Sequence, residues 1–347
     1  MKSIALSLSL LIFSFGVFAQ KADSKSEKFF KNPVFTPDLA DPTVIKATDG
    51  WFYAYGTENT WTDGIHHIVP VVKSKDMLHW EYVADAFKSR PAWKQNGGIW
   101  APDVNVVNGK YYMYYSYSTW GDPNPGIGLA IADKPEGPFV DHGKIFDSKS
   151  IGVENSIDPC FVQVNKKNEL RSYVFWGSFH GIYGIELTDD LTKTQGEKFK
   201  IAGSAFEATY IKERNGKFYF FGSLGSCCEG ARSQYRVGVA VADDIKGPYK
   251  DRDGNAVLND WAQGTLLIAG NAADGWVGPG HNSEIIKDAA GNDYLFYHAI
   301  EVANPNLPGG ATRRPLMLDR IHWVKGWPTI QGTKPGTDFQ KKPRIKQ

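Results

Sequence analysis

The sequence predicts an all-β fold, a five-bladed β-propeller built from four-stranded antiparallel blades. Three observations support this prediction: a strand–turn–strand motif occurs five times, a second pair of strands follows most copies, and no long amphipathic helix is evident. Five four-stranded sheets around one axis lie within the usual range of blade numbers for propellers. Two β-sandwiches would have a similar content of strands, but they do not require the same motif at the head of a strand five times.

The repeated motif is a short strand, a polar turn that usually contains glycine, and an aromatic strand that ends in small residues. Its spacing of roughly 50–75 residues is looser than that of most repeat proteins. β-Branched and aromatic residues suit strands, and Asn, Asp and Gly suit the turn between them, so each copy predicts a β-hairpin. The copies are DPTVIKATDGWFYAYGT from Asp41, APDVNVVNGKYYMYYSYS from Ala101, DPCFVQVNKKNELRSYVFWGS from Asp158, EATYIKERNGKFYFFGS from Glu207 and HNSEIIKDAAGNDYLFYHA from His281.

A second motif follows most copies and supplies the outer half of each blade. It is again a strand, then a turn that carries Asp, then a weaker strand, so each repeat predicts four antiparallel strands. The segments are VPVVKSKDMLHWEYV, IGLAIADKPEGPFVDHG, IYGIELTDDLTKTQGE and VGVAVADDIKGPYKDRDG, with RRPLMLDRIHWVKGWPTI as the fifth counterpart.

The composition allows a large core and argues against two classes of partner. Of the 347 residues, 42% are hydrophobic and 14% are aromatic, which is ample for a domain of this size. The 39 basic and 38 acidic residues give a formal net charge of +1. Nothing in this charge indicates nucleic acid or a membrane surface as a partner.

The N-terminus is typical of an exported protein. Residues 1–19 contain one lysine, an apolar run and small residues before a cleavage site expected after Ala19. A buried or membrane-spanning helix is the alternative, but the run of about 16 residues is short for a span. We therefore expect a secreted or periplasmic protein with a signal peptide at 1–19, a polar leader at 20–32, the propeller at 33–332 and a C-terminal tail at 333–347.

The chain contains three cysteines, Cys160, Cys227 and Cys228. In an exported protein an odd number leaves at least one thiol unpaired if all disulfides are internal. The spacing of Cys and His residues is not typical of a zinc site. Cys227 and Cys228 are compatible with a vicinal disulfide or with two thiols.

Polar residues at the heads of the inner strands indicate a functional cavity. The innermost strand of each blade lines the central channel, so equivalent positions on the five strands should approach one another near the axis. These positions are Asp41, Ala101, Asp158, Glu207 and His281. A single acid at such a position is more often a cap of a turn or strand, but three acids in one register favour a catalytic role. Close carboxylates disfavour joint ionisation, which raises one pKa and leaves an acid beside an ionised base.

A pair of carboxyl groups across a cleft suits the hydrolysis of glycosidic bonds. One group protonates the leaving oxygen, and the other activates water or attacks directly. Aromatic residues near the axis would supply stacking faces for sugar rings, and Trp100 and Phe179 are the candidates. A place in the core is the alternative for Trp100, because eleven tryptophans cannot all contact a substrate. Blade two differs from the others, with Ala101 at the head and Asp103 two residues later.

The chain resembles family 43 glycoside hydrolases, especially the arabinanases, over nearly all of residues 33–330. Single matching segments are short, but their number and order make the set specific. The segments are ADPTV, WAPDV, NSIDP, GSFHGI, EATYI, SLGSCCEG, DDIKGPY, GPGHNS and RRPLMLDRIHW. EATYI followed by CCEG and then GPGHNS is similar to enzymes that cleave α-1,5-linked arabinan internally.

The resemblance implies a five-bladed propeller with an inverting mechanism. It implies that Asp41 is the general base, that Glu207 is the general acid, and that Asp158 tunes the pKa of the acid and orients it. It also implies substrate contacts from Trp100, Asn155, Ser178 and Phe179. His281 matches a histidine associated with a metal ion in the channel, commonly calcium, and such an ion would be held largely by water because calcium prefers oxygen ligands. No organic cofactor is implied.

Two departures from the family pattern affect the binding groove rather than the acids. His180 stands where arabinanases usually have Trp, and VNKKNELRSY replaces an Asp-Gly turn. An exo-acting α-L-arabinofuranosidase or a β-xylosidase on the same scaffold therefore remains an alternative to internal cleavage. A sugar-binding propeller without catalysis is a further alternative, although all three acids are present. The expected partner is arabinan or an arabino-oligosaccharide, bound by a monomer.

Overall fold

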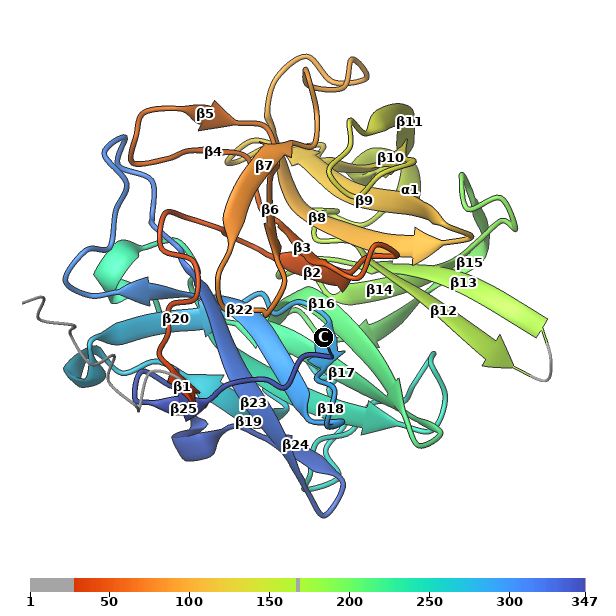
Figure 1. Cartoon of the computed structure of the whole chain (residues 1–347). Coiled ribbons are helices and arrows are strands. Elements are labelled where there is room, and N and C mark those ends of the chain that lie inside the picture. Colours follow the sequence, from red (N-terminus) through yellow and green to blue (C-terminus); the bar gives the residue numbers. More distant parts are fainter. Residues whose placement is uncertain (1–27, 167–168, 347) are drawn as a thin grey trace, which may run out of the picture.

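The predicted fold is confirmed: the computed structural model is a five-bladed β-propeller with antiparallel four-stranded blades (Figure 1). It describes residues 28–166 and 169–346. The predicted signal peptide and residues 20–27 of the predicted leader lie outside this range. The helical content of the described residues is small, since the one α-helix, α1, spans only Ser148–Ile151.

Each of the first four blades contains four strands in sequence order. Blade one is β2 (Thr43–Lys46), β3 (Phe52–Tyr55), β6 (Pro70–Ser74) and β7 (Glu81–Asp85). Blade two is β8 (Gly98–Val107), β9 (Lys110–Ser118), β10 (Gly126–Ala132) and β11 (Val140–Asp147). Blade three is β12 (Cys160–Lys166), β13 (Glu169–Trp176), β14 (Ile182–Leu187) and β15 (Thr194–Ala202). Blade four is β16 (Phe206–Arg214), β17 (Lys217–Leu224), β18 (Arg236–Ala242) and β19 (Thr265–Ala269).

Blade five has an inner strand in two pieces. Both β20 (Trp276–Gly280) and β21 (Ile285–Lys287) pair with β22 (Asp293–Glu301), which is followed by β23 (Leu316–Val324) and β24 (Trp327–Thr329). His281 lies directly after β20, in this break. A small hairpin of β4 (Asn59–Thr60) and β5 (His66–His67) extends from blade one.

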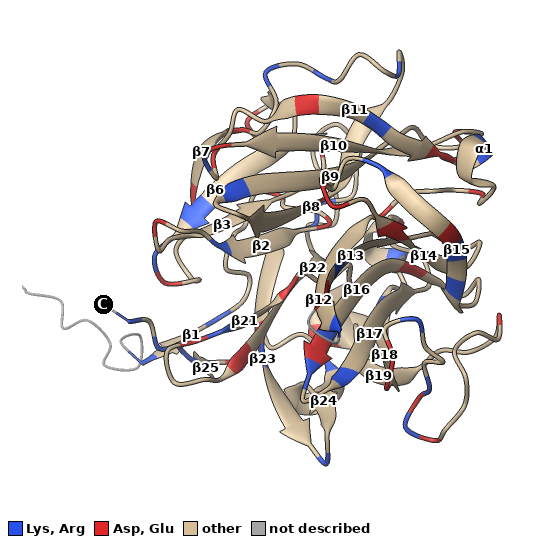
Figure 2. Ribbon diagram, turned by 90° about the vertical axis from the view of Figure 1, so that its right-hand side faces the viewer, with Lys and Arg blue, Asp and Glu red and all other residues tan. Residues whose placement is uncertain are grey.

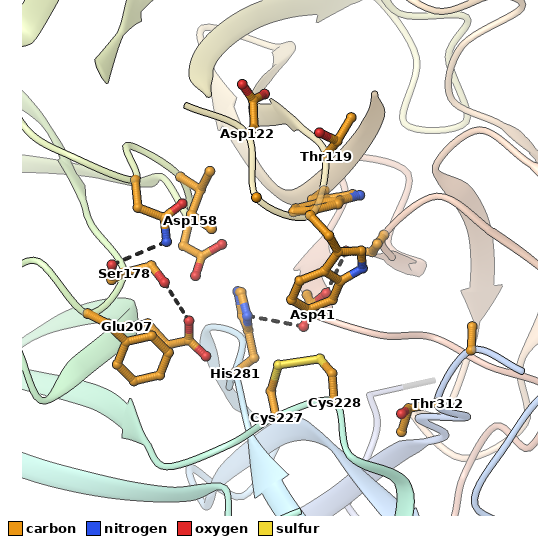
Figure 3. Close-up of a pocket in the computed structure, with 18 of the residues that line it drawn as sticks. Asp41, Thr119, Asp122, Asp158, Ser178, Glu207, Cys227, Cys228, His281 and Thr312 are labelled. Carbon is orange, nitrogen blue, oxygen red and sulfur yellow. Dashed lines mark hydrogen bonds and ion pairs between the residues drawn. A yellow bond between two sulfur atoms is a disulfide. The ribbon is translucent and has the colours of Figure 1, made fainter. Parts of the chain in front are cut away.

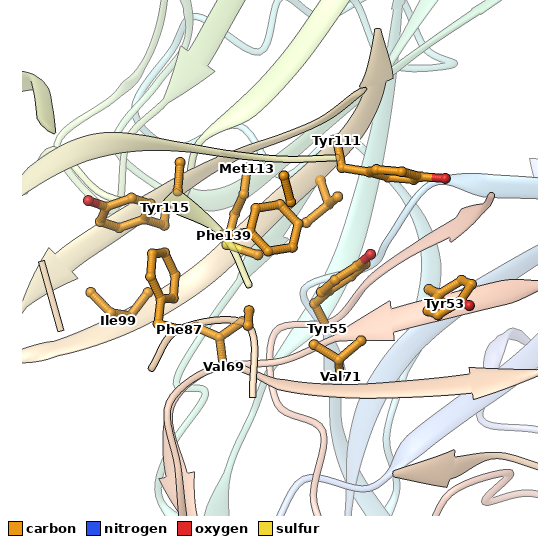
Figure 4. Close-up of a cluster of buried hydrophobic side chains, with 14 of the residues drawn as sticks. Tyr53, Tyr55, Val69, Val71, Phe87, Ile99, Tyr111, Met113, Tyr115 and Phe139 are labelled. Atoms are coloured by element: carbon orange, nitrogen blue, oxygen red, sulfur yellow. The ribbon is translucent and has the colours of Figure 1, made fainter. Parts of the chain in front are cut away.

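The hydrophobic core is divided into five clusters, one between each pair of neighbouring blades. Successive side chains of a strand point to opposite faces of its sheet, so one strand serves two clusters. In β9, Tyr111, Met113 and Tyr115 pack toward blade one, whereas Tyr114 packs toward blade three. Figure 4 shows the first of these clusters, where Tyr53 and Tyr55 of blade one meet the β9 side chains. The aromatic strands of the repeat are the second strands of the blades, and their large side chains fill the clusters on both faces of each sheet.

The two ends of the described chain meet beside blade five. β1 (Phe29–Phe30) pairs with β25 (Gln340–Lys341), and the backbone N–H of Val34 donates a hydrogen bond to the carbonyl of Leu316 at 2.9 Å. Phe30 and Phe35 pack in the cluster between blades five and one. The end of the predicted leader and the predicted tail thus join the ring at the interface between its first and last blades.

Charged residues of both signs are interspersed over the ribbon in Figure 2, in agreement with the net charge of +1. In the part of the chain that the structure describes, no helix has the length and apolar character needed to cross a membrane.

Candidate active site

The heads of the inner strands share an unusual backbone conformation. A non-glycine residue with positive φ occurs at the same place in all five blades, a conformation that is uncommon outside glycine. These residues are Asp41 (φ 52°), Ala101 (φ 43°), Asp158 (φ 59°), Ala208 (φ 53°) and His281 (φ 46°). The predicted register is wrong in blade four, because Ala208 and not Glu207 occupies the repeated position. Glu207 instead corresponds to Trp100, the residue before Ala101.

Hydrogen bonds link four of these five positions to the preceding blades. The backbone N–H of Asp41 donates to His298 Nδ1 at 3.1 Å, that of Ala101 to Thr57 Oγ1 at 2.9 Å, that of Asp158 to Ser116 Oγ at 2.8 Å and that of His281 to Ser223 Oγ at 2.9 Å. The acceptors lie on or just after the second strands of the blades. The small residues that end the aromatic strands in the sequence therefore hold the inner-strand heads in place.

A cavity of about 880 Å³ opens at these heads (Figure 3). The structure brings all eight predicted site residues to its wall: Asp41, Trp100, Asn155, Asp158, Ser178, Phe179, Glu207 and His281. Asp103 is not part of this wall. Its carboxylate accepts hydrogen bonds from the backbone N–H of Phe161 at 2.6 Å and from Asn105 Nδ2 at 2.8 Å.

Asp41 is surrounded by cationic and hydrogen-bonding groups. Its Oδ1 lies 2.7 Å from Arg314 Nη1 and 3.2 Å from His281 Nδ1, and its Oδ2 accepts a hydrogen bond from Thr57 Oγ1 at 2.6 Å. Burial alone would raise the pKa of Asp41, but the charges of Arg314 and His281 outweigh it and hold the pKa well below its usual range. Asp41 is therefore ionised at neutral pH, as a base requires.

Glu207 has neutral partners. Its Oε2 accepts a hydrogen bond from Ser178 Oγ at 2.7 Å, and Tyr235 is a second hydrogen-bonding partner. Burial raises the pKa of Glu207, and the bonds from Ser178 and Tyr235 only partly oppose this shift. Burial also raises the pKa of Asp158, and the negative charge of Glu207 raises it further. Carboxyls with raised pKa values thus lie in the same cavity as the ionised Asp41, so an acid and a base are available together.

The pKa values of His281 and His298 are shifted in opposite directions. Burial alone would lower the pKa of His281, but Asp41 raises it above its usual value. His298 is fully buried, and burial together with Arg314 lowers its pKa well below its usual range. Since His298 Nδ1 accepts the N–H of Asp41, its proton lies on Nε2.

The surroundings of His281 limit how a calcium ion could bind. Calcium takes six to eight oxygen ligands. Among residues 28–166 and 169–346, no group of three or more His, Cys, Asp or Glu side chains is arranged to hold a metal ion. His281 Nδ1 faces Asp41, which leaves Nε2. The residues therefore do not form a protein cage for calcium. They fit only an ion held by water and by Nε2 of His281 after loss of the proton that Asp41 stabilises.

The predicted substrate-binding residues lie on two sides of the cavity. On blade two, the ring of Trp100 lies 5.5 Å from that of Trp120, which is 77% exposed. On blade three, Asn155 Nδ2 donates to the carbonyl of Ser178 at 3.3 Å, and Phe179 is 39% exposed. His180 also lines this side, with its Nδ1 3.2 Å from Glu154 Oε2. One side is thus aromatic, and the other is more polar.

Sequence reasoning missed several residues of the site: Thr57, Trp120, Tyr235, His298 and Arg314. Thr57 and His298 could have been found, because they belong to the small or polar residues that end the aromatic strands. Arg314 begins the segment RPLMLDR that was matched to the family, but no local signal indicated its contact with Asp41. Trp120 and Tyr235 lie in or beside loops between strands, where no repeat signals a role.

Known proteins resemble this chain over most of its length. The sequence profile of glycosyl hydrolases family 43 matches residues 30–328. An extracellular endo-α-(1→5)-L-arabinanase of Bacillus subtilis is 32% identical over 304 residues, which are 84% of this chain and 87% of that protein. An extracellular exo-α-(1→5)-L-arabinofuranosidase of Cellvibrio japonicus is 31% identical over 323 residues, which are 84% of this chain and 86% of the relative.

Solved structures of similar proteins have the same architecture. An α-L-arabinanase of Cellvibrio cellulosa in complex with arabinohexaose superposes with a TM-score of 0.72 at 28% identity, over 85% of this chain and 96% of that chain. An endo-arabinanase of Bacillus licheniformis gives a TM-score of 0.72 at 30% identity, over 86% of this chain and all of the other.

Proposed function

Because this chain belongs to glycosyl hydrolases family 43 and is a glycoside hydrolase, we propose that it cleaves α-1,5-L-arabinofuranosidic bonds in arabinan by an inverting acid–base mechanism. The observation that carries this proposal is that the pKa values of two carboxyls in one cavity are shifted in opposite directions. Asp41 is held ionised by Arg314 and His281, whereas burial favours the protonated form of Glu207.

In the proposed reaction Asp41 accepts a proton from water as the water attacks the anomeric carbon. Glu207 donates its proton to the leaving oxygen, while the neighbouring Asp158 tunes the pKa of Glu207 and orients it. Ser178 orients Glu207, and Thr57 orients Asp41. Inversion needs room for a water between base and sugar, with carboxyls about 6.5–9.5 Å apart. The positions of Asp41 and Glu207 on non-adjacent blades favour such a wide spacing.

Trp100, Asn155 and Phe179 are proposed to contact the sugars. The stacking face would come from Trp100, whose neighbour Trp120 extends the aromatic side of the cavity. The relatives include both endo- and exo-acting enzymes, and exo action is the second candidate. The pair of His180 and Glu154 favours this candidate, because it places polar side chains in the cavity wall where the family resemblance leads us to expect the stacking face of a Trp.

The test is the incubation of the purified protein with linear arabinan, debranched arabinan and aryl glycosides, followed by sizing of the products. Oligosaccharides in the first minutes support internal cleavage, whereas arabinose alone supports exo action. Proton NMR of the first-formed anomer tests the stereochemistry, and a product that retains the α configuration would contradict inversion. Release of no sugar from any arabinan would contradict the proposed substrate.

A calcium ion near His281 is a separate proposal, supported by the family resemblance and restricted to an ion held by Nε2 and water. An ion that binds only the folded channel should raise the melting temperature. A chelator should therefore lower the melting temperature of the wild type, calcium should restore it, and His281→Ala should abolish the response. Equal melting of the wild type with chelator and with calcium would contradict a significant exchangeable site.

Export and monomeric action complete the proposal. The apolar N-terminus and the extracellular relatives support export, and the small residue Ala19 is the expected cleavage position. N-terminal sequencing of the protein recovered outside the cytoplasm, and sedimentation of the purified chain, are the measurements.

A further inference from the structure

Cys227 and Cys228 form a disulfide between neighbouring residues, and both line the catalytic cavity. Figure 3 shows their sulfur atoms on the wall of the cavity, directed toward the side chains of His281 and Asp41. Both residues are half-buried, so the sulfurs are open to a molecule in the cavity. The third cysteine, Cys160, is a free thiol buried in the core between blades three and four.

Stabilisation of the fold is a poor explanation for this disulfide. A disulfide constrains the unfolded chain more strongly when it closes a longer loop. Here the sequence separation is one residue, so almost no loop is closed. The bond also joins no two strands or blades. Because the disulfide lines the cavity, a role in the cavity itself is the better explanation.

The turn that carries the disulfide is fixed at both ends. At its base, the backbone N–H of Gln234 donates to the carbonyl of Ser226 at 3.1 Å. At its far end, the backbone N–H of Gly230 donates to Thr312 Oγ1 at 3.2 Å, which ties the turn to the segment before β23. Thr312 lines the same cavity. The sulfurs are thus held in place as part of a wall shared by blades four and five.

The chemistry of this wall differs from that of its surroundings. Asp41, Glu207 and Arg314 offer charges and hydrogen bonds, which suit hydroxyl groups. A disulfide has no S–H to donate and presents soft, polarisable sulfur atoms that pack against apolar groups. A furanose ring carries C–H groups as well as hydroxyls, and its C–H groups need an apolar partner.

We propose that the Cys227–Cys228 disulfide is a sugar-contacting surface of the substrate site, on which one arabinofuranose ring packs through its C–H groups. The disulfide then acts in binding rather than in the proton transfers. This inference rests on the proposed function, since arabinan supplies the furanose ring.

The test measures binding separately from catalysis. A Glu207→Gln chain serves as the parent, and its affinity for arabinohexaose is measured by calorimetry. Cys227→Ala and Cys228→Ala, introduced together, should weaken binding roughly 3- to 10-fold, the effect of losing a few tens of Å² of apolar contact. The melting temperature should change little. Glu229→Gln is the matched control, because this exposed residue of the same turn lies outside the cavity wall and should leave binding unchanged.

A second arm needs no substitution in the turn. A water-soluble phosphine, itself oxidised to its oxide, reduces the disulfide of the parent to two thiols. This should weaken the binding of arabinohexaose in the parent and have no effect in the double cysteine variant, which retains Cys160. No binding by the untreated parent would overturn the proposed substrate. Binding by the parent that neither reduction nor the double substitution weakens would overturn only the disulfide contact.

Discussion

Asp41 and Glu207 face one cavity from blades one and four, and both carboxyls are largely removed from solvent, yet their pKa values are shifted in opposite directions. Burial raises the pKa of each. The difference arises from the partners, since Asp41 contacts Arg314 and His281, whereas Glu207 contacts the hydroxyls of Ser178 and Tyr235. The same desolvated cavity can therefore hold a base and an acid at one pH.

The cations beside Asp41 come from one part of the ring. Arg314 and His281 both belong to the fifth repeat, and so does His298, which accepts the backbone N–H of Asp41. The partners of Glu207 belong to blades three and four. Closure of the ring between its last and first blades is thus needed to form the ionised base, whereas the hydrogen bonds of the acid come from blades three and four.

The largest expected effect comes from removal of either carboxyl. Asp41→Asn and Glu207→Gln should each lower the rate of arabinan hydrolysis about 10²- to 10⁴-fold, because each removes a proton-transfer group. Steady-state kinetics with the melting temperature measured in parallel is the check. Glu213→Gln is a matched control in the same strand as Glu207, at its exposed outer end. A variant at Asp41 or Glu207 with near-normal turnover would refute its role.

The next effect tests the source of the low pKa of Asp41. Arg314→Gln removes the strongest of the charges that lower this pKa, so the pKa should rise. Asp41 must be ionised to act as a base, and the acidic limb of the pH–rate profile should therefore move to higher pH. We expect the rate of hydrolysis at low pH to fall at least tenfold, because a protonated Asp41 cannot act as the general base. The rate should recover partly as the pH increases.

Arg314→Lys separates charge from shape in this experiment. Lysine keeps the positive charge but lacks the planar guanidinium, so the acidic limb should move less than with glutamine. Equal acidic limbs in wild type and Arg314→Gln would show that Arg314 does not control the ionisation of Asp41.

A smaller effect on the rate is expected from substitution of Asp158, the carboxyl near Glu207. The charge of Glu207 raises the pKa of Asp158, and since such repulsion is mutual, Asp158→Asn should remove an interaction that opposes the ionisation of Glu207. Glu207 should then lose its proton at lower pH, and the alkaline limb should move to lower pH with a rate loss of roughly tenfold. A pH profile is the measurement. An unmoved alkaline limb with an unchanged rate would leave Asp158 a structural role only.

The fold was predictable because the repeat carries two regular signals, the hairpin pattern and the head residue, and five copies of each reinforce one another. The acids were predictable for the same reason. The register in blade four was not, since Glu207 and Ala208 both fit the head of β16 in the sequence, and only the positive φ at Ala208 distinguishes them. Arg314 and Tyr235 were missed because their contacts join segments far apart in the chain, which no local pattern encodes.

The smallest expected effect concerns the hydroxyl of Ser178, which contacts Glu207. Ser178 Oγ donates to Glu207 Oε2 at 2.7 Å, and this bond lowers the pKa of Glu207. Ser178→Ala should therefore raise that pKa and move the alkaline limb to higher pH, the direction opposite to that of Asp158→Asn. The rate should fall only about 2- to 10-fold, in keeping with one hydrogen bond. Ser178→Thr keeps the hydroxyl and is the control. If both Ser178→Ala and Asp158→Asn moved the alkaline limb in the same direction, the limb would report a group other than Glu207, and the assignment of the acid would have to change.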